Sequence, residues 1–257
     1  MRRALIWSLA GIVSMVFTIL IFLPAAWLAS LLEIQTAGRL TLGDAQGTLW
    51  RGSAFVGAAP SSGDPVTPLL PGRFIWQLSP TVLLGRVDAV LENTASLSHQ
   101  IKITGDWRQW QISPSMITLP AERLTALGAP LNTIKPSGEM NLSWKLLQLT
   151  RKEEVVEMTG LMKLELKDIA SRLSPIKPLG AYDLTFNWHG QQADMVLKTV
   201  KGPMLLSGSG KINNGRLQFS GTAQAEVGEE NKLGNLLNLL GKRSQLGGKE
   251  IILLEFK

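Results

Sequence analysis

Residues 4–32 carry no charged side chain, and an uncharged run of 29 residues has few places in a folded protein. Within it, residues 5–23 are almost wholly apolar, and about 20 apolar residues in a helix are enough to span a bilayer. Arg2 and Arg3 precede the run, and the next charged residue is Glu33. Because positive charges favour the cytoplasmic side, the sequence predicts a single membrane-spanning helix with a cytoplasmic N-terminus.

Four further residues belong to this predicted anchor. Trp7 and Trp27 lie near its two ends, where indole rings favour the interface between lipid and water. Gly11 lies close to serine and alanine residues, which together form either a small-residue patch for helix packing or a lipid-facing surface. Leu23 ends the most apolar part of the run.

A cleaved signal peptide is the alternative to an anchor. Such a peptide has an apolar region of about 7–15 residues, followed by small residues at the cleavage site. Here the apolar region is longer, and Pro24 occupies the −3 position of the nearest candidate site. We therefore expect residues 1–32 to form a cytoplasmic tip and a membrane anchor, and residues 33–257 to form one domain on the far side.

Alternation of apolar and polar residues replaces the continuous apolar run in the rest of the chain, and it predicts strands that are buried on one side. Such segments lie at residues 140–146, 162–167 and 182–189, and residues 251–256 are expected to form another strand. Asn214 and Gly215 separate two short alternating segments. Both residues readily adopt positive φ, so they predict a two-residue hairpin turn.

Two short helices are expected among these strands. Residues 120–128 begin with proline and end with glycine, which favour the start and the end of a helix. Residues 229–242 carry acids at the start and bases at the end, which suits the helix dipole. Four prolines between Pro60 and Pro71 predict a loop. The sequence thus predicts a mainly β domain with a large antiparallel sheet and two short helices.

Three tryptophans end strand-like segments that each begin at a glycine: Trp76, Trp144 and Trp188. The recurring pattern predicts successive strands of one antiparallel sheet, with the tryptophans on one face. In the simpler interpretation they fill a closed core, as aromatic side chains commonly do. The alternative is an open groove that takes an acyl chain or an apolar side chain of a partner.

No set of residues is typical of a catalytic or cofactor site. The chain has no cysteine, which excludes disulfides, thiolate metal sites and a cysteine nucleophile. The two histidines, His99 and His189, lie far apart without a metal-binding motif. Residues 208–211 lack the earlier glycine of a phosphate loop, and Ile212 stands where a hydroxyl side chain would bind magnesium. We therefore expect no catalytic residue, no cofactor, no metal and no enzymatic activity.

The net charge of +6 does not indicate nucleic-acid binding. Arg2 and Arg3 account for two of these charges, which leaves +4 for the rest of the chain. The densest basic clusters elsewhere, at residues 151–152 and 242–243, are only pairs. A nucleic-acid surface has an extended basic stripe with interleaved aromatic residues, so we expect no nucleic-acid partner.

Four segments, in order along the chain, resemble the type II secretion system protein N family (general secretion pathway protein N). They are GRLTLGDAQGTLWRGSA at residues 38–54, LPAERLTALGAPLNT at 119–133 followed by PSG at 136–138, SRLSPIKPLGAY at 171–182, and NLLNLLG at 235–241. The resemblance implies a bitopic, single-pass protein of the bacterial inner membrane, with its main domain in the periplasm. It also implies an accessory role in the export of folded periplasmic proteins, with other inner-membrane subunits of the assembly platform as partners.

The resemblance supplies no catalytic residue. By analogy of fold alone, a large curved antiparallel sheet of this kind resembles the open trough or half-barrel of bacterial lipid-transfer proteins.

Two functions follow as hypotheses. The first is an interaction protein of the secretion machine, which binds partners through sheet edges and helix packing. The second is a carrier or bridge for lipid or lipopolysaccharide along a tryptophan-lined hydrophobic trough. The two hypotheses differ in whether the tryptophans line a groove that solvent reaches or a closed core.

Overall fold

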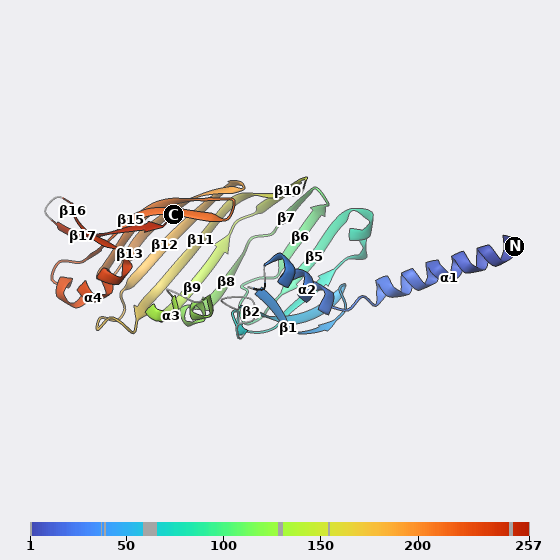
Figure 1. Cartoon of the computed structure of the whole chain (residues 1–257), viewed down its shortest axis with the longest axis horizontal. Helices are drawn as coiled ribbons and strands as arrows, with labels where there is room; N and C mark the ends of the chain where they lie inside the picture. Colours follow the sequence, from blue (N-terminus) through green and yellow to red (C-terminus); the bar gives the residue numbers. More distant parts are fainter. Residues whose placement is uncertain are drawn as a thin grey trace.

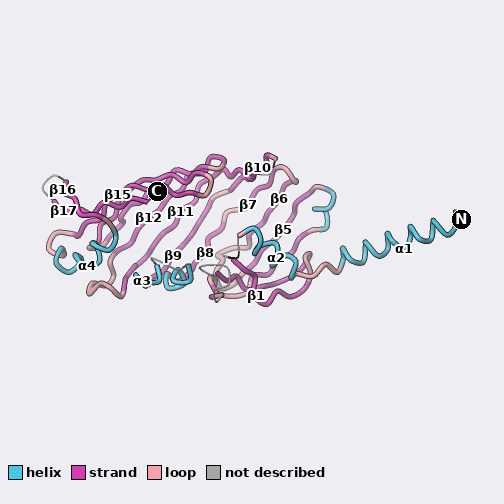
Figure 2. Tube along the Cα trace, viewed as in Figure 1, coloured by secondary structure: helices cyan, strands magenta, loops and turns pink. Residues whose placement is uncertain are grey.

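The computed structural model describes residues 2–36, 38, 40–58, 66–127, 131–153, 155–246 and 249–256 of the 257-residue chain. Its strands are β1 (Leu40–Gly47), β2 (Arg51–Ala58), β3 (Thr67–Pro68), β4 (Phe74–Leu78), β5 (Arg86–Glu92), β6 (Ile101–Asp106), β7 (Gln109–Ile112), β8 (Ser115–Pro120), β9 (Pro136–Trp144), β10 (Leu147–Lys152), β11 (Val155–Ser171), β12 (Gly180–Gly190), β13 (Gln192–Lys201), β14 (Met204–Asn213), β15 (Arg216–Ala225), β16 (Lys242–Leu246) and β17 (Lys249–Phe256). Its α-helices are α1 (Arg2–Ile21), α2 (Ala26–Gln35), α3 (Leu131–Ile134) and α4 (Glu230–Leu240), and its 3₁₀ helices are η1 (Pro80–Leu84) and η2 (Ala121–Leu127). Figures 1 and 2 show a long curved sheet from which α1 projects at one end.

Seventeen strands of the described chain belong to one open antiparallel sheet. From β4 to β7 and from β11 to β15, each strand pairs with the next one in the sequence. At one end, β2 pairs with β1 and with β3 and β4. At the other end, β17 pairs with β15 and β16. The prediction of a mainly β fold with one large antiparallel sheet is confirmed.

The middle of the sheet is built around β11, which is 17 residues long. One edge of β11 pairs with β12, and its other edge is shared by β10 and β9. β10 pairs in turn with β7, and β9 with β8, so the sheet continues across this region. The register shifts on both edges of β11 around Asp168, whose φ is 49°. Such bulges bend a strand and increase the twist of the sheet.

The strands and the hairpin predicted from alternation are confirmed. The three alternating segments lie in β9, β11 and β12, and the further predicted strand at residues 251–256 lies in β17. Asn214 and Gly215 join β14 to β15 with φ values of 49° and 75°. Both residues therefore have the positive φ that a two-residue hairpin turn of this kind requires.

The helix predictions are only partly right. The second helix ends at Leu240 rather than Lys242, because Lys242 begins β16 and pairs with Leu253 of β17. The first lies in η2, a 3₁₀ helix, and its expected terminal residue Gly128 is outside the described residues. Helices α2, η1 and α3 come in addition to the two that were expected. Of the predicted loop, the part up to residue 65 is outside the described residues, and residues 67–68 form the short strand β3.

The N-terminal uncharged run forms two helices, α1 and α2, separated by residues 22–25. Between the two helices, the backbone forms hydrogen bonds with the end of β1 and with the residues that follow β1. The Leu49 N–H donates to the Leu23 carbonyl oxygen (2.8 Å), and the Ala25 N–H donates to that of Gly47 (3.1 Å). Within the described residues, no helix combines the length and the apolar character that crossing a membrane requires. The structure therefore does not support the predicted single span.

Candidate functional site

One face of the sheet is apolar over most of its length. In β12, Tyr182, Leu184, Phe186 and Trp188 alternate with more polar residues, so their side chains point to the same face. Opposite them on β11 lie Leu166, Leu164, Met162 and Gly160. We call this side of the sheet the apolar face.

The strand register carries the apolar face to the other end of the sheet. Trp144 of β9 pairs with Met162 of β11 and so shares the face with Trp188. Trp76 of β4 pairs with Leu91 of β5, which pairs with Ile101 of β6. On the same face, Ile103 of β6 pairs with Ile112 of β7, which pairs with Leu147 of β10. Leu147 precedes the β10 residues that pair with β11. The three predicted tryptophans thus lie on one face, at separate places along the sheet.

The opposite face, which we call the polar face, carries charged side chains in ion pairs, together with some exposed apolar residues such as Leu161 and Val196. Lys163 of β11 forms ion pairs with Glu165 (2.8 Å) and with Asp183 of β12 (2.9 Å). Hydrogen bonds to Glu165 and Asp183 raise the pKa of Lys163 above its ordinary value. His189 lies on this face, 3.6 Å from Asp194, and both side chains are more than half exposed. Exposed ion pairs of this kind contribute little to stability and are typical of a solvated surface.

Helix α4 covers the C-terminal end of the apolar face. Leu233, Leu236 and Leu237 are buried and pack in one cluster with residues of β12 to β17. Tyr182 belongs to this cluster and is 1% exposed. Its hydroxyl donates to the Met204 carbonyl oxygen (3.0 Å), so the one polar atom of the side chain is satisfied.

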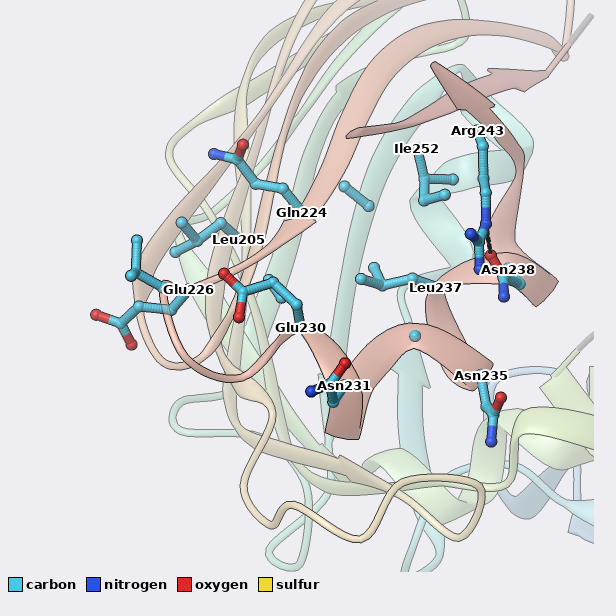
Figure 3. Close-up of a pocket in the computed structure, with 14 residues that line it drawn as sticks. Leu205, Gln224, Glu226, Glu230, Asn231, Asn235, Leu237, Asn238, Arg243 and Ile252 are labelled. Carbon is cyan, nitrogen blue, oxygen red and sulfur yellow. Dashed lines mark hydrogen bonds between the residues drawn. The ribbon is translucent and has the colours of Figure 1, made fainter. Parts of the chain in front are cut away.

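A pocket of about 630 Å³ lies between α4 and strands β14, β15 and β17 (Figure 3). Leu237 and Ile252 provide its apolar wall, and both also belong to the core cluster. Figure 3 shows amide and carboxylate side chains around it, among them Asn231 and Glu230. The pocket has room for a small ligand, but much of its apolar surface is already part of the core.

Helix α2 covers the N-terminal end of the apolar face. Trp76 is 9% exposed and clusters with Ala25 and Ala54, and Leu28 of α2 packs against them. The indole Nε1–H of Trp76 donates to the Leu49 carbonyl oxygen (3.0 Å). Trp76 therefore lies in a closed core rather than in a groove.

Between these two ends the apolar face is less completely covered, although Ile101 and Leu147 on it are 6% and 4% exposed. In the described part of the chain, neither buried cluster includes a residue of β6, β7 or β10. Trp110, Trp144, Met158 and Trp188 lie there and are only half-buried. We call these four residues the open stretch. Trp144 Nε1–H donates to the Ser113 carbonyl oxygen (2.9 Å), whereas the enclosed Nε1–H of Trp188 has no hydrogen-bond partner among the described residues.

The residues of the predicted anchor lie on α1, on α2 or between them. They are Arg2, Arg3, Trp7, Gly11, Leu23 and Trp27. Trp7 and Trp27 are 78% and 66% exposed. A side chain added at Gly11 would meet no atom within 4 Å, and Leu23 is half-buried at the contact with the sheet. The side chains of the two arginines lie outside what the structure describes.

Two tryptophans with structural roles escaped the sequence analysis. Trp50 Nε1–H donates to the Leu20 carbonyl oxygen (2.7 Å), which ties the end of α1 to the turn between β1 and β2. No local pattern predicts a contact between residues thirty positions apart. Trp110 belongs to the open stretch, and the alternation of residues 109–112 was the signal that could have identified it.

Within the described residues, no group of three or more His, Asp or Glu side chains is placed to hold a metal ion. What the arrangement offers is non-covalent binding, on the open stretch and in the pocket beside α4. Apolar surfaces of this kind bind apolar ligands or partner side chains.

Residues 20–251 match the family model described as type II secretion system (T2SS), protein N. No curated protein and no solved structure matches the chain. The matched range contains α2, α4 and all four segments whose resemblance the sequence showed. Because the match covers most of the chain and agrees with that resemblance, the chain belongs to the type II secretion system protein N family.

Proposed function

We propose that this chain is an accessory component of the type II secretion system that acts by binding other subunits and has no enzymatic role. Family membership ties it to secretion and to the bacterial envelope. The observation that carries the binding role is the open stretch, which α2 and α4 leave uncovered in the described part of the chain. Its aromatic side chains offer a large apolar contact area at a low cost in rotamer entropy.

We further propose that the uncharged residues 4–32 hold the protein at the inner membrane, with the sheet in the periplasm. Support comes from the run itself and from the two arginines before it. Apolar side chains of α1 are also exposed, for example Ile12 (60%) and Met15 (65%). The boundary between anchor and periplasmic domain at residue 32 stays a prediction, and α2 runs across it.

The partners that fit this location are other inner-membrane subunits of the secretion assembly platform. Such a subunit would meet α1 through the small residues around Gly11, and would meet the sheet through an apolar segment on the open stretch. The second contact removes half-buried aromatic surface from water, which favours association.

Photo-crosslinking in cells that carry the whole secretion system tests the proposal. A photoreactive residue replaces Trp144 or Trp188 in turn, and Asn187 is the matched control because it neighbours Trp188 on β12 and points to the polar face. We expect adducts with inner-membrane secretion subunits from the two tryptophan positions and none from Asn187. Subunit adducts from Asn187 alone would contradict a binding role for the open stretch.

A second candidate function is a carrier or bridge for lipid or lipopolysaccharide. One observation favours it: the enclosed Nε1–H of Trp188, in an apolar setting, has no hydrogen-bond partner in the part of the chain that the structure describes. A buried donor without a partner costs free energy, and a lipid carbonyl or phosphate oxygen beside the ring would satisfy it. Lipid adducts at Trp144 and Trp188, in place of protein adducts, are the result that selects this function.

A further inference from the structure

Three large apolar side chains are exposed together where the sheet ends. Leu83 and Leu84 of η1 are 50% and 87% exposed, and Trp107 in the turn between β6 and β7 is 56% exposed. The Trp107 Nε1–H donates to the Val82 carbonyl oxygen (2.6 Å), so the turn and η1 are held side by side. We call Leu83, Leu84 and Trp107 the apolar tip.

The apolar tip belongs to a preformed structure. Ser79 begins η1, and its side chain accepts a hydrogen bond from the Thr81 N–H (3.3 Å). Gly85 ends η1 with a φ of 89°, a value that glycine adopts readily. The 3₁₀ turn is thus closed at both ends, and the two leucines project from a fixed backbone.

Exposed arginines flank the apolar tip. Arg86 follows η1 directly, and Arg108 follows Trp107. The backbone N–H of Arg151 donates to the Arg108 carbonyl oxygen (2.7 Å), which brings a third arginine to the same place. Two acids also lie nearby. The Asp106 carboxylate accepts hydrogen bonds from the backbone N–H groups of Arg108 (2.7 Å) and Gln109 (2.8 Å), and the Asp88 carbonyl oxygen accepts one from the Ser79 N–H (2.8 Å). Three exposed arginines thus lie beside the tip, together with the exposed acids Asp88 and Asp106.

The apolar tip lies at the end of the sheet from which α1 projects. Ile21 at the end of α1 and Pro80 at the start of η1 line one pocket, together with Trp50. The hydrogen bond from Trp50 to the Leu20 carbonyl oxygen fixes the end of α1 beside this part of the sheet.

We infer that the apolar tip is a second membrane contact, which enters the interface of a bilayer that contains anionic lipids. Leucine and tryptophan side chains favour this interface, and arginines beside them attract anionic headgroups. The inference rests on the proposed location of α1 in the membrane, because that location brings the tip to the bilayer surface.

Two membrane contacts would fix the orientation of the sheet relative to the bilayer, whereas α1 alone would let the sheet rotate about the helix axis. A pocket of about 530 Å³ is lined by Trp107 of the tip, by Trp110 of the open stretch and by Arg151. The tip and the open stretch are therefore neighbours, and the contact holds one end of the open stretch at the bilayer surface.

Depth-dependent quenching in vesicles tests the contact on the full chain. The chain has no cysteine, so a single introduced cysteine carries the only thiol-reactive dye. The dye is placed at Leu84→Cys, at Val227→Cys as a control that is 82% exposed in a turn before α4, and at Ile12→Cys on α1. The vesicles contain phosphatidylcholine and phosphatidylglycerol, with a fraction of the lipid carrying a quencher at the top of the acyl chain to probe the interface, or near its end to probe the bilayer centre at Ile12→Cys.

We expect the dye at Leu84→Cys to be quenched at least about twofold more than the dye at Val227→Cys. Equal quenching at these two positions, with strong quenching at Ile12→Cys, overturns the second contact and leaves the α1 anchor standing. Strong quenching at Leu84→Cys without quenching at Ile12→Cys supports the tip and contradicts the proposed anchor. No quenching at any position contradicts both.

A charge reversal tests the role of the arginines. The pair Arg86→Glu and Arg108→Glu is expected to reduce quenching at Leu84→Cys to the level seen in phosphatidylcholine alone. The control pair, Lys198→Glu and Arg172→Glu, makes the same charge change at exposed positions away from the tip and is expected to leave quenching unchanged. Equal loss in both pairs would assign the effect to overall charge and overturn the specific role of the tip.

Discussion

Large aromatic side chains on the apolar face lie opposite glycines of the neighbouring strand. The pairs are Trp76 with Gly52, Trp110 with Gly105, Trp188 with Gly160, and Phe219 with Gly210. A glycine has no side chain, so the aromatic ring opposite it can lie close to the backbone of the glycine's strand. This arrangement buries aromatic surface against the backbone of the sheet itself.

Gly208 gives a direct test of this close packing. A Cβ at this position would overlap the ring of Phe219 and would lie 2.7 Å from the Ser220 carbonyl oxygen. We expect Gly208→Ala to lower the free energy of unfolding by about 1–3 kcal/mol, the usual cost of overpacking. Gly234→Ala on α4 is the control, because its Cβ meets no atom within 4 Å, and it should raise the free energy of unfolding by up to about 1 kcal/mol. Denaturant titration measures both, and equal effects would contradict the packing argument.

Tyr182 predicts a change of stability at high pH. Burial raises the pKa of Tyr182 above its ordinary value, and the chain has no other tyrosine. The contribution of the neutral hydroxyl is complete below the unfolded pKa of about 10, and it is lost as the pH rises, because only the unfolded tyrosine ionises there. We expect Tyr182→Phe to show a smaller fall in unfolding free energy between about pH 8 and about pH 11 than the unmodified chain. Loss of the hydrogen bond to Met204 should cost about 1 kcal/mol at pH 8. Parallel pH profiles for the two proteins would show that this hydroxyl does not control the effect.

At the scale of elements, α4 packs against the sheet through only one of its own faces. Leu233 is fully buried, whereas Leu239 on the same helix is 66% exposed. We expect Leu233→Ala to lower the free energy of unfolding by about 2–5 kcal/mol, and the matched Leu239→Ala to change it by about 0.5 kcal/mol or less. Thermal or denaturant unfolding distinguishes them. Similar losses in both variants would mean that helix propensity, rather than packing on the sheet, holds α4.

Elements whose determinants are local could be predicted from the sequence. β12 shows its sidedness in its own alternation, and the turn at Asn214 and Gly215 depends only on those two residues. The end of α4 could not be predicted, since Lys242 leaves the helix to pair with Leu253, and only the folded sheet decides that pairing. The charges of residues 229–242 favour a helix up to Lys242, but the pairing of Lys242 with β17 ends the helix earlier.

The candidate site, too, could be predicted only where its signal is local. The pattern of a glycine, a strand and a tryptophan identified Trp144 and Trp188, which lie on the open stretch. It gave no means to separate them from Trp76, which α2 covers. Contacts between distant segments hold α2 on the sheet, such as the hydrogen bond between Leu49 and Leu23 and the packing of Leu28, and contacts of this kind leave no periodic signal.

At the scale of the whole molecule, the two ends of the sheet are unequal. Among the described residues, the cluster under α4 contains twelve buried side chains, from Leu179 to Leu254, whereas the cluster under α2 contains three. Regions with few buried apolar contacts open at a lower free energy than well-packed ones. Within the described part of the chain, β6 and β7 contribute to neither cluster, so stability should fall away from β12–β17 toward β6 and β7.

Amide hydrogen exchange on the full chain tests this gradient. We expect the slowest exchange in β12 to β15 and faster exchange in β6 and β7, because local opening there exposes less buried surface. Trp76→Ala removes the largest side chain of the smaller cluster and should speed exchange in β2 and β4 without changing β13 to β15. Leu233→Ala should do the reverse, since its contacts lie under α4. If each variant instead speeds exchange equally at both ends, the sheet opens as one cooperative unit. Continuous strand pairing, rather than the two clusters, would then set the stability of the molecule.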